Sequence, residues 1–228
     1  MPKKLSNRLS ACLNALFPLK RIADIGTDHA YLPCVGVTTG KLTSAIAIDV
    51  IDGPLMRART TIQDYGLVEQ IEVRKGSGFE PLAVGEVEGV VIAGMGGKLI
   101  GKLMVDSLDV AQSMKRLVLQ PQSGEATLRR TLFDHDFTIT NEQLLEEDGI
   151  IYTIITAIPG EANMTELDVT FGPLLRQNVK AKLFIQKWQQ ELTAINKVIR
   201  NIPEDNVRRT EFEQKRKLIE EVLTGATN

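Results

Sequence analysis

The stretch FTITNEQLLEEDGIIYTIITAIPG, residues 137–160, decides the fold of this chain. It contains two runs rich in β-branched and aromatic residues, which predict strands over 137–147 and 150–158. Asp148 and Gly149 join the runs, and an Asp-Gly pair between strands favours a type I′ turn. The sequence therefore predicts a long antiparallel hairpin. Such a hairpin departs from the dinucleotide dehydrogenases, whose sheet continues with parallel strands.

Upstream of the hairpin, short apolar runs alternate with helical patterns, as in βαβ units. The runs are nearly continuous, as expected of parallel strands that are covered on both faces. Strands are predicted over residues 21–25, 44–50, 71–75, 89–93 and 116–120. Parallel strands closed by an antiparallel hairpin are typical of Rossmann-like class I methyltransferases, which use S-adenosylmethionine. An α/β fold of that class is therefore predicted.

The composition is that of a globular protein without membrane spans. The chain has 228 residues, of which 43% are hydrophobic and 25% charged, and no apolar run approaches the roughly 20 residues of a membrane-spanning helix. Leucines at the N-terminus predict an amphipathic helix instead of a signal peptide. Cys12 and Cys34 lack the spacing of metal ligands and are expected to be small buried residues in a reducing compartment. We expect a cytoplasmic protein without a bound metal.

A change in composition after Gly160 predicts two domains, residues 1–162 and 163–228. Apolar residues from Ala181 to Ile202 recur in alternating steps of 4 and 3, which predicts a helical coiled-coil hairpin. Residues 174–217 carry 11 Lys and Arg against 5 Asp and Glu. This excess of positive charge indicates a polyanionic partner. A solvated helix surface is the alternative.

The loop after the first predicted strand argues against a phosphate-containing cofactor. In DIGTDHAYLP, residues 24–33, Gly26 permits a tight turn, but the further glycines of a GxGxxG motif are missing. Asp24 and Asp28 would repel a pyrophosphate, whereas carboxylates favour the sulfonium and amino groups of S-adenosylmethionine. We therefore expect S-adenosylmethionine and not NAD. Capping of the following helix is an alternative role for Asp28.

Later strand ends carry further candidate binding residues. Asp49 lies 23 residues after Gly26, the spacing at which an acid binds ribose hydroxyls, although a surface aspartate would look the same. Glycines in KGSGF (75–79) and VVIAGMGGK (90–98) leave room for a flat ring near the backbone. LQPQ (119–122) offers amides that can read a base edge. Motifs of Ser hydrolases, zinc proteases and P-loop proteins are absent from the sequence.

Taken in order, the motifs DIGTDHAYLP, AIDVIDGP, GSGFE, IAGMGG, LQPQ and LLEEDG resemble the bacterial tRNA adenine-22 N1-methyltransferase family. The resemblance covers residues 5–160, and the predicted tail is similar to the coiled-coil hairpin of that family. It implies methyl transfer from S-adenosylmethionine to N1 of adenine 22 in tRNA. One departure is Ser77, where the family often has Asp; another is Gln122, often Asn.

The loop chemistry and the resemblance together give a set of candidate residues. Asp28 is the catalytic candidate, because a carboxylate near N6 would orient the adenine and stabilise the positive charge that develops on it. The remaining candidates fall into cofactor-binding and base-binding residues. The cofactor-binding candidates are Asp24, Gly26, Thr27, Asp49, Val50, Gly76, Ser77, Gly78, Ala93, Gly94 and Met95, and the base-binding candidates are His29, Tyr31, Gln120, Pro121 and Gln122.

Two other functions stay open on sequence alone. One is a methyltransferase for a small molecule or another RNA adenine, which would not need the basic tail. The other is an RNA adaptor that binds S-adenosylmethionine without turnover. The expected partner is tRNA, with a monomer and no obligate protein partner.

Overall fold

The computed structural model describes residues 4–227 and contains two compact units, Met1–Pro173 and Leu174–Asn228. The sequence placed the boundary eleven residues earlier, after residue 162. The difference arises because α7 (Glu166–Phe171) packs against α6 (Glu125–Asp134) of the first unit. Buried Arg129 of α6 donates hydrogen bonds to the carbonyls of Val169 (3.2 Å) and Thr170 (3.1 Å).

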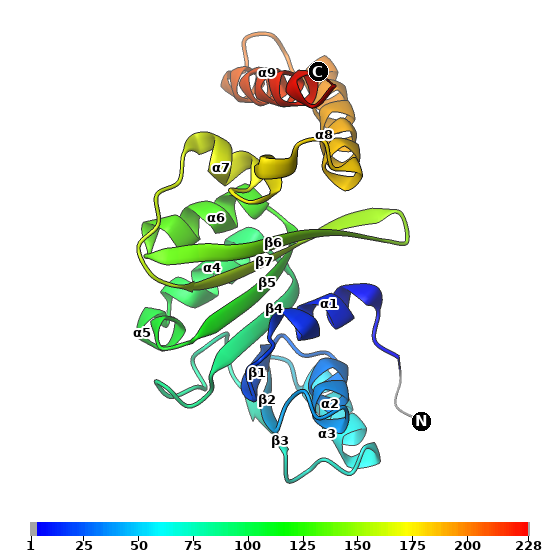
Figure 1. The fold of residues 1–228 in the computed structure, drawn as a ribbon, viewed down its shortest axis with the longest axis vertical. Coiled ribbons are helices and arrows are strands. Elements are labelled where there is room, and N and C mark those ends of the chain that lie inside the picture. The colour runs from blue at the N-terminus through cyan, green and yellow to red at the C-terminus, as the bar shows by residue number, and fades with distance from the viewer. Residues whose placement is uncertain (1–3, 228) are drawn as a thin grey trace. The chain divides into compact units, whose positions relative to one another are not determined.

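The first unit is built on one seven-stranded sheet in the order β3-β2-β1-β4-β5-β7-β6 (Figure 1). Its strands are β1 (Arg21–Ile25), β2 (Ser44–Asp49), β3 (Ile71–Lys75), β4 (Gly89–Gly96), β5 (Arg116–Ser123), β6 (Phe137–Glu147) and β7 (Ile150–Pro159). Strands β1 to β5 are parallel, and β7 pairs antiparallel with both β5 and β6. The predicted α/β fold with a C-terminal hairpin is confirmed.

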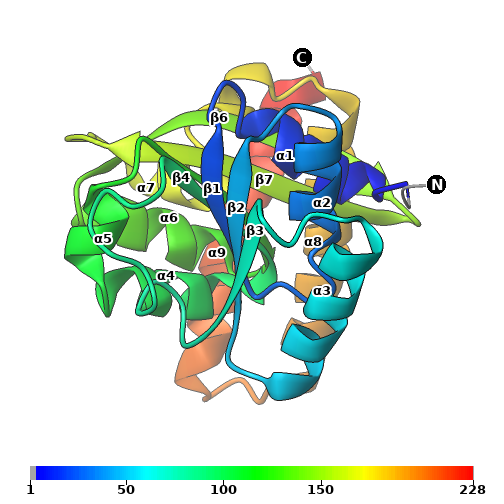
Figure 2. The same ribbon diagram turned by 90° about the horizontal axis from the view of Figure 1, so that it is seen from below.

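Helices cover both faces of this sheet. The helices before α7 are α1 (Asn7–Ala15), α2 (Tyr31–Thr38), α3 (Asp52–Asp64), α4 (Gly97–Val105), α5 (Leu108–Gln112) and α6. Figure 2 shows α1, α2 and α3 on one side of the sheet and α4, α5 and α6 on the other. Strands β1 and β2 are accordingly buried along most of their length and β4 along its first half, which explains their continuous apolar runs.

The turn that decided the fold has the predicted geometry. Asp148 (φ 52°) and Gly149 (φ 77°) both adopt positive φ, as a type I′ turn requires. Near this turn, the Glu147 carboxylate accepts a hydrogen bond from the backbone N–H of Asn7 (2.5 Å). The hairpin thus holds the first turn of α1.

Helix α1 is the predicted amphipathic helix. Ser6 caps it by accepting a hydrogen bond from Leu9 N (3.2 Å), while Cys12 and Leu13 are buried. Both cysteines of the chain are free and buried. Burial raises the pKa of each thiol to about 12, so these thiols stay protonated and act as packing groups.

A buried ion pair stabilises the β6 side of the first unit. Arg129 Nε donates to Glu142 Oε1 at 2.7 Å, and the two side chains are 2% and 0% exposed. Because removing one partner would leave an uncompensated buried charge, this pair is structural rather than part of a surface network.

The second unit is the predicted helical hairpin. It contains η1 (Leu175–Asn178), α8 (Lys182–Asn201) and α9 (Val207–Thr227), and α8 packs against α9. Trp188, Ile195 and Ile199 of the predicted seam are buried. Phe184, which the heptad pattern missed, is also buried and contacts the Trp188 ring at 6.1 Å between centroids.

Candidate cofactor and substrate site

The candidate site lies where the strand order reverses. Strand β1 has β2 on one side and β4 on the other, so the loops that follow β1 and β4 diverge at their carboxyl ends. Open α/β sheets bind ligands at this position. Two cavities open along this edge of the sheet.

The first cavity, of about 120 Å³, is formed by the ends of β1, β2, β3 and β4. Seven of the predicted cofactor residues line it: Gly26, Asp49, Val50, Gly76, Ser77, Gly78 and Met95. Ile25 of β1 and Leu99 and Leu103 of α4, which were not among the candidate site residues, complete its wall. The cavity is mostly apolar with one carboxylate, which suits a flat ring attached to a sugar.

The second cavity, of about 230 Å³, lies between the β1 loop and α1 and is more polar. Its predicted lining residues are Asp24, Gly26, Thr27, Asp28, His29, Tyr31 and Ala93, and its unpredicted ones are Arg8, Leu9, Ala30 and Leu32. The predicted cofactor and substrate residues of this loop therefore do gather at one place.

Gly26 lines both cavities and marks the junction between them. Its φ of 78° is one that side chains rarely adopt, and a Cβ there would lie 2.2 Å from Met95 Cε. The turn after β4 contributes to both cavities as well, since Ala93 lines the second and Met95 the first. A ligand longer than either cavity could therefore pass from one to the other over a bare glycine.

Asp49 is positioned by its own loop. Its Oδ1 accepts a hydrogen bond from Ile51 N (2.8 Å), and its carbonyl accepts one from Gly76 N (3.1 Å). Within residues 4–227, Oδ2 has no hydrogen-bond partner. One carboxylate oxygen thus fixes the side chain and the other can accept a hydroxyl.

The glycines at 76 and 78 are explained by close packing rather than by flexibility. A Cβ on Gly76 would lie 2.3 Å from Pro81 Cγ, and one on Gly78, where φ is 58°, would lie 2.9 Å from Leu103 Cβ. Ser77 between them is exposed. The loop can therefore approach a ring through its backbone, and Ser77 also lines the cavity.

Asp24 is the buried acid of the site. Only 9% of the residue is exposed; Thr27 hydrogen-bonds its carboxylate, and no described residue forms an ion pair with it. Loss of hydration on burial, with a smaller contribution from Asp49, raises its pKa to about 6. A buried carboxylate without a cation favours binding of a positively charged ligand group.

Asp28 lies on the exposed side of the second cavity. Arg57 of α3 donates a hydrogen bond to its carboxylate, and His29 Nε2 lies 3.3 Å from Oδ2. The alternative role of Asp28 as a helix cap is wrong, because α2 has Ala30 as its N-cap and no side-chain cap bond. Asp28 therefore faces the cavity with its charge partly balanced by Arg57.

Next to Asp28, two rings stack. The His29 and Tyr31 centroids are 5.0 Å apart with 16° between the ring planes. Ala30 between them has a positive φ of 52°, and its N–H donates to Thr27 Oγ1 (3.1 Å). This strained turn directs both rings to the cavity, where a base could extend the stack.

The three base-binding candidates of β5 are placed differently from the prediction. Gln120 is fully buried: its Oε1 accepts from Gly94 N (3.1 Å) and from Arg8, and its Nε2 donates to Pro121 O (2.9 Å). Its amide is therefore already committed, and Gln120 supports the Gly94 turn instead of reading a base. Pro121 is buried and Gln122 exposed, and like Gly94 neither lines the two cavities.

Arg8 is the main functional candidate that the sequence reasoning missed. From α1 it lines the second cavity, donates to Gln120, and lies over the Tyr152 ring at 5.3 Å. A signal was available: Arg8 falls between Leu5 and Cys12 on the apolar stripe, where a charge is unexpected. Arg57 gave no such signal, because it lies 29 residues from Asp28 in the sequence and the two side chains come together only in the folded protein.

Within residues 4–227 no three His, Cys, Asp or Glu side chains are arranged to hold a metal ion. No helix in that range has the length and apolar character needed to cross a membrane.

The strand order, the reversed β7 and the acid-lined glycine turn define a Rossmann-like methyltransferase that uses S-adenosylmethionine. The antiparallel β7 differs from the parallel sheet of the dinucleotide dehydrogenases. The carboxylates of Asp24 and Asp28 would repel a pyrophosphate at Gly26.

Comparisons with known proteins narrow this class. The family described as tRNA (adenine(22)-N(1))-methyltransferase, TrmK, matches residues 22–224. A Bacillus subtilis enzyme of that description is 36% identical over 195 residues, 83% of this chain and 82% of its own. The solved B. subtilis TrmK structure has a TM-score of 0.89 at 32% identity and covers 96% and 99% of the two chains. A Streptococcus pneumoniae relative in complex with S-adenosylmethionine has a TM-score of 0.87 at 36% identity, covering 96% and 100%.

The chain belongs to the tRNA (adenine(22)-N(1))-methyltransferase family. The predictions of the family, of an S-adenosylmethionine-dependent enzyme and of a tRNA substrate are thereby confirmed.

Proposed function

We propose that this chain methylates N1 of adenine 22 in tRNA with its cofactor lying across Gly26, and that the target adenine enters the second cavity beside Asp28. The observation that supports this best is the pair of cavities that meet at Gly26. Neither cavity alone would house both halves of the cofactor together with a base. A cytoplasmic location and a monomeric state remain predictions.

The first cavity fits the adenosine half of the cofactor. Asp49 offers one unpaired carboxylate oxygen to a ribose hydroxyl, while the Gly76–Gly78 backbone and Leu103 provide the walls for the ring. Added side chains at 76 or 78 would collide with Pro81 or Leu103, so the glycines are needed to keep this space.

The second cavity fits the amino-acid half. Asp24 would pair with the ammonium group, and Arg8 would pair with the carboxylate. Among the described residues lining this cavity, Arg8 is the one permanent cation, since Arg is always charged at ordinary pH. The cofactor supplies an electrophilic methyl group on its sulfonium, and Gly26 leaves that position open.

The residues around the base need only orient it, because adenine N1 already carries a lone pair. Asp28 would accept a hydrogen bond from the exocyclic amine, which becomes more acidic as the ring gains positive charge. The stacked His29 and Tyr31 rings would hold the base plane. Adenine 22 must leave its stack to reach this cavity, as other enzymes that modify bases require.

A transfer experiment with two tRNA transcripts tests the proposed function. Methyl-labelled S-adenosylmethionine is incubated with the protein and a tRNA carrying either A22 or G22. We expect 1-methyladenosine at position 22 of the first transcript and no label in the second. Equal labelling of both transcripts would indicate another RNA adenine, and cofactor binding without any transfer would indicate the adaptor function.

Asp49→Ala should weaken binding of S-adenosylmethionine by about 1–3 kcal/mol, because a hydroxyl acceptor is lost from a partly buried site. Asp64→Ala, on the exposed end of α3, is the matched control and should bind as the parent does. Isothermal titration calorimetry measures both. Unchanged affinity in Asp49→Ala would remove this carboxylate from the ribose site.

Cofactor affinity should depend on pH through Asp24. Its pKa of about 6 in the free protein must fall when a cation binds, so affinity should rise as pH increases from 5 to 7 and then level off. Binding near pH 6 should release a proton, which calorimetry in buffers of different ionisation enthalpy detects. Asp24→Asn should remove this dependence and weaken binding at pH 7.5.

The same carboxylate should affect the stability of the fold in the opposite direction: stability should fall as pH rises. Since folding raises its pKa above the unfolded value near 3.8, the stability it contributes is lost as pH rises from about 4 to 6. Asp24→Asn should therefore raise the free energy of unfolding at pH 7, by at most about 3 kcal/mol. A variant that binds normally and is no more stable would contradict a buried, unpaired charge at Asp24.

A further inference from the structure

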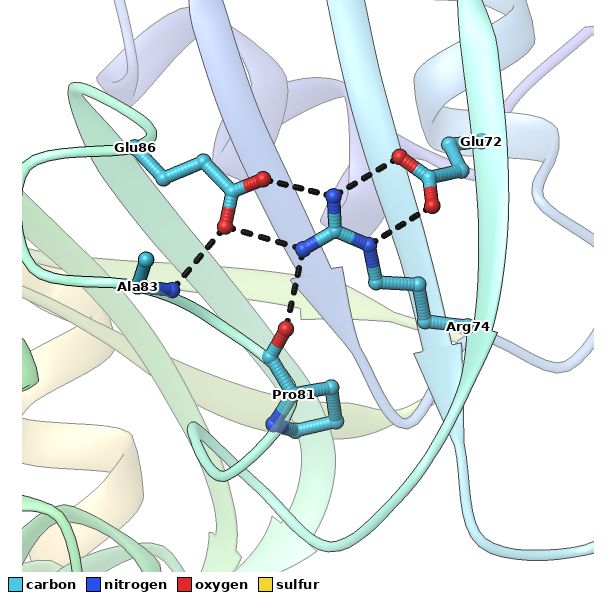
Figure 3. Close-up of polar contacts among 5 residues, drawn as sticks. All are labelled: Glu72, Arg74, Pro81, Ala83 and Glu86. Carbon is cyan, nitrogen blue, oxygen red and sulfur yellow. Dashed lines mark hydrogen bonds and ion pairs between the residues drawn. The ribbon is translucent and has the colours of Figure 1, made fainter.

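A side-chain cluster outside both cavities holds the loop that follows β3. Arg74 of β3 is its centre, and Figure 3 shows Glu72 and Glu86 on either side of the guanidinium. Glu72 accepts from Arg74 Nε (2.8 Å) and Nη2 (2.7 Å), and Glu86 accepts from Nη1 (2.8 Å) and Nη2 (2.5 Å). Each carboxylate is thus bound by two donors, the strongest arrangement available to arginine.

The last guanidinium donor reaches the backbone of the loop. Arg74 Nη1 also donates to the carbonyl of Pro81 at 2.9 Å, so all five N–H groups of Arg74 are used. Glu86 in turn accepts from Ala83 N at 2.9 Å. The segment from Pro81 to Glu86 is therefore fixed to β3 through a single side chain.

Pro81 connects this cluster to the first cavity. Its ring lies against the bare Cα of Gly76, where an added Cβ would be 2.3 Å from Pro81 Cγ. Gly76, Ser77 and Gly78 form one wall of that cavity. A shift of Pro81 would therefore move the wall against which the adenosine is proposed to bind.

The cluster keeps its charges over the whole range in which the enzyme can be assayed. The Arg74 hydrogen bonds lower the pKa of Glu86 to about 2 and also lower that of Glu72. Arg74 and Glu86 are only partly exposed, at 23% and 29% of their side chains. The ion pairs of Arg74 with Glu72 and Glu86 are thus insensitive to pH in this range, in contrast to the charge of Asp24.

We propose that Arg74 is a positioning residue for the adenosine half of the cofactor: through Pro81 and Glu86 it sets the place of the Gly76–Gly78 wall. This proposal rests on the proposed function, because it takes the first cavity as the adenosine site. Arg74 itself touches neither cavity. Its effect should therefore appear in cofactor affinity and not in the methyl-transfer step.

The test compares Arg74→Met and Arg74→Lys with the parent enzyme. Arg74→Met keeps the unbranched apolar part of the side chain but loses all five donors, and we expect its Kd for S-adenosylhomocysteine and its KM for S-adenosylmethionine to rise about tenfold. Arg74→Lys keeps the positive charge but can donate to only some of these acceptors. Its Kd and KM should therefore lie between those of Arg74→Met and those of the parent. The kcat at saturating cofactor and the KM for tRNA should equal the parent values.

Two further measurements separate positioning from general destabilisation. The affinity loss in Arg74→Met should be the same for 5′-methylthioadenosine, which lacks the amino-acid half, and should be constant between pH 6 and 8. Arg59→Met, a change at an exposed arginine of α3, should bind as the parent does. If Arg74→Met does not fold, Glu86→Gln should show a smaller loss in the same direction.

Two results would overturn the inference: parent-like affinity in Arg74→Met or Glu86→Gln, or a loss confined to S-adenosylhomocysteine and absent for 5′-methylthioadenosine. Failure of the proposed function would look different. In that case the parent enzyme itself would bind neither compound, or would bind both and transfer no methyl group to position 22 of tRNA.

Discussion

Ending the chain after Pro173 should leave binding of S-adenosylmethionine nearly intact and reduce tRNA affinity on the order of 10³-fold at physiological salt. The proposed cofactor residues all lie in the first unit, whereas the basic helices lie in the second. Residues 174–217 carry 11 Lys and Arg against 5 Asp and Glu. Cations that neutralise phosphates release counterions, and this release provides much of the affinity of proteins for nucleic acids.

The structure shows which of these cations are available. Lys182, Lys197, Arg200 and Arg208 are exposed. Arg209 is different: it donates to Glu213 (2.9 Å) and to the carbonyl of Ile202 (2.9 Å), so it stabilises the turn between α8 and α9. We therefore expect Arg209 to be structural, although it counts among the cations of residues 174–217.

Charge reversal tests the same prediction in the full chain. Lys197→Glu with Arg200→Glu should weaken tRNA binding and reduce the slope of log affinity against log salt by roughly one unit per lost contact. Lys41→Glu, an exposed change in the first unit just before β2, is the control. Parent affinity and parent salt slope in the double variant, or tRNA methylation at the parent rate by the truncated chain, would show that the second unit only packs or dimerises.

Asp28→Asn should fold, bind cofactor as the parent does, and lose about 10²-fold in the single-turnover rate of methyl transfer. The amide keeps the shape of the side chain but cannot stabilise the positive charge that develops on adenine. Because Asp28 is exposed and its partner Arg57 is also exposed, the substitution should change the free energy of unfolding very little.

Arg57→Gln separates catalysis from the ion pair. It breaks the same Asp28–Arg57 contact but leaves the carboxylate in place, so most of the turnover should remain. If Asp28→Asn matched the parent rate, Asp28 would be only the partner of Arg57. Equal losses in the two variants would show that the pair, and not the carboxylate, matters.

The fold could be predicted from the sequence because its signals are local. The Asp148-Gly149 turn has one favoured geometry, and the continuous apolar runs of β1, β4 and β5 identify buried parallel strands. The domain boundary was predicted less accurately, because α7 is short and its packing on α6 depends on Arg129, which is distant in the sequence. Contacts of that kind leave no periodic pattern in the sequence.

The gathering of the candidate site residues could be predicted where a residue owes its place to the end of a strand. Asp24, Gly26, Asp49 and Gly76 gather because parallel strands end at one edge. Gln120 was misjudged because the sequence does not show which way a side chain of β5 points. Its amide turns inward to Gly94 and Arg8.

A crystal structure of the protein with S-adenosylhomocysteine tests the placement of the cofactor most directly. We predict the adenine and ribose in the first cavity beside Asp49 and the Gly76–Gly78 wall, the sulfur next to Gly26, and the amino-acid group beside Asp24 in the second cavity. An adenine ring found between Asp28 and Tyr31, with the amino-acid group at Asp49, would contradict this account.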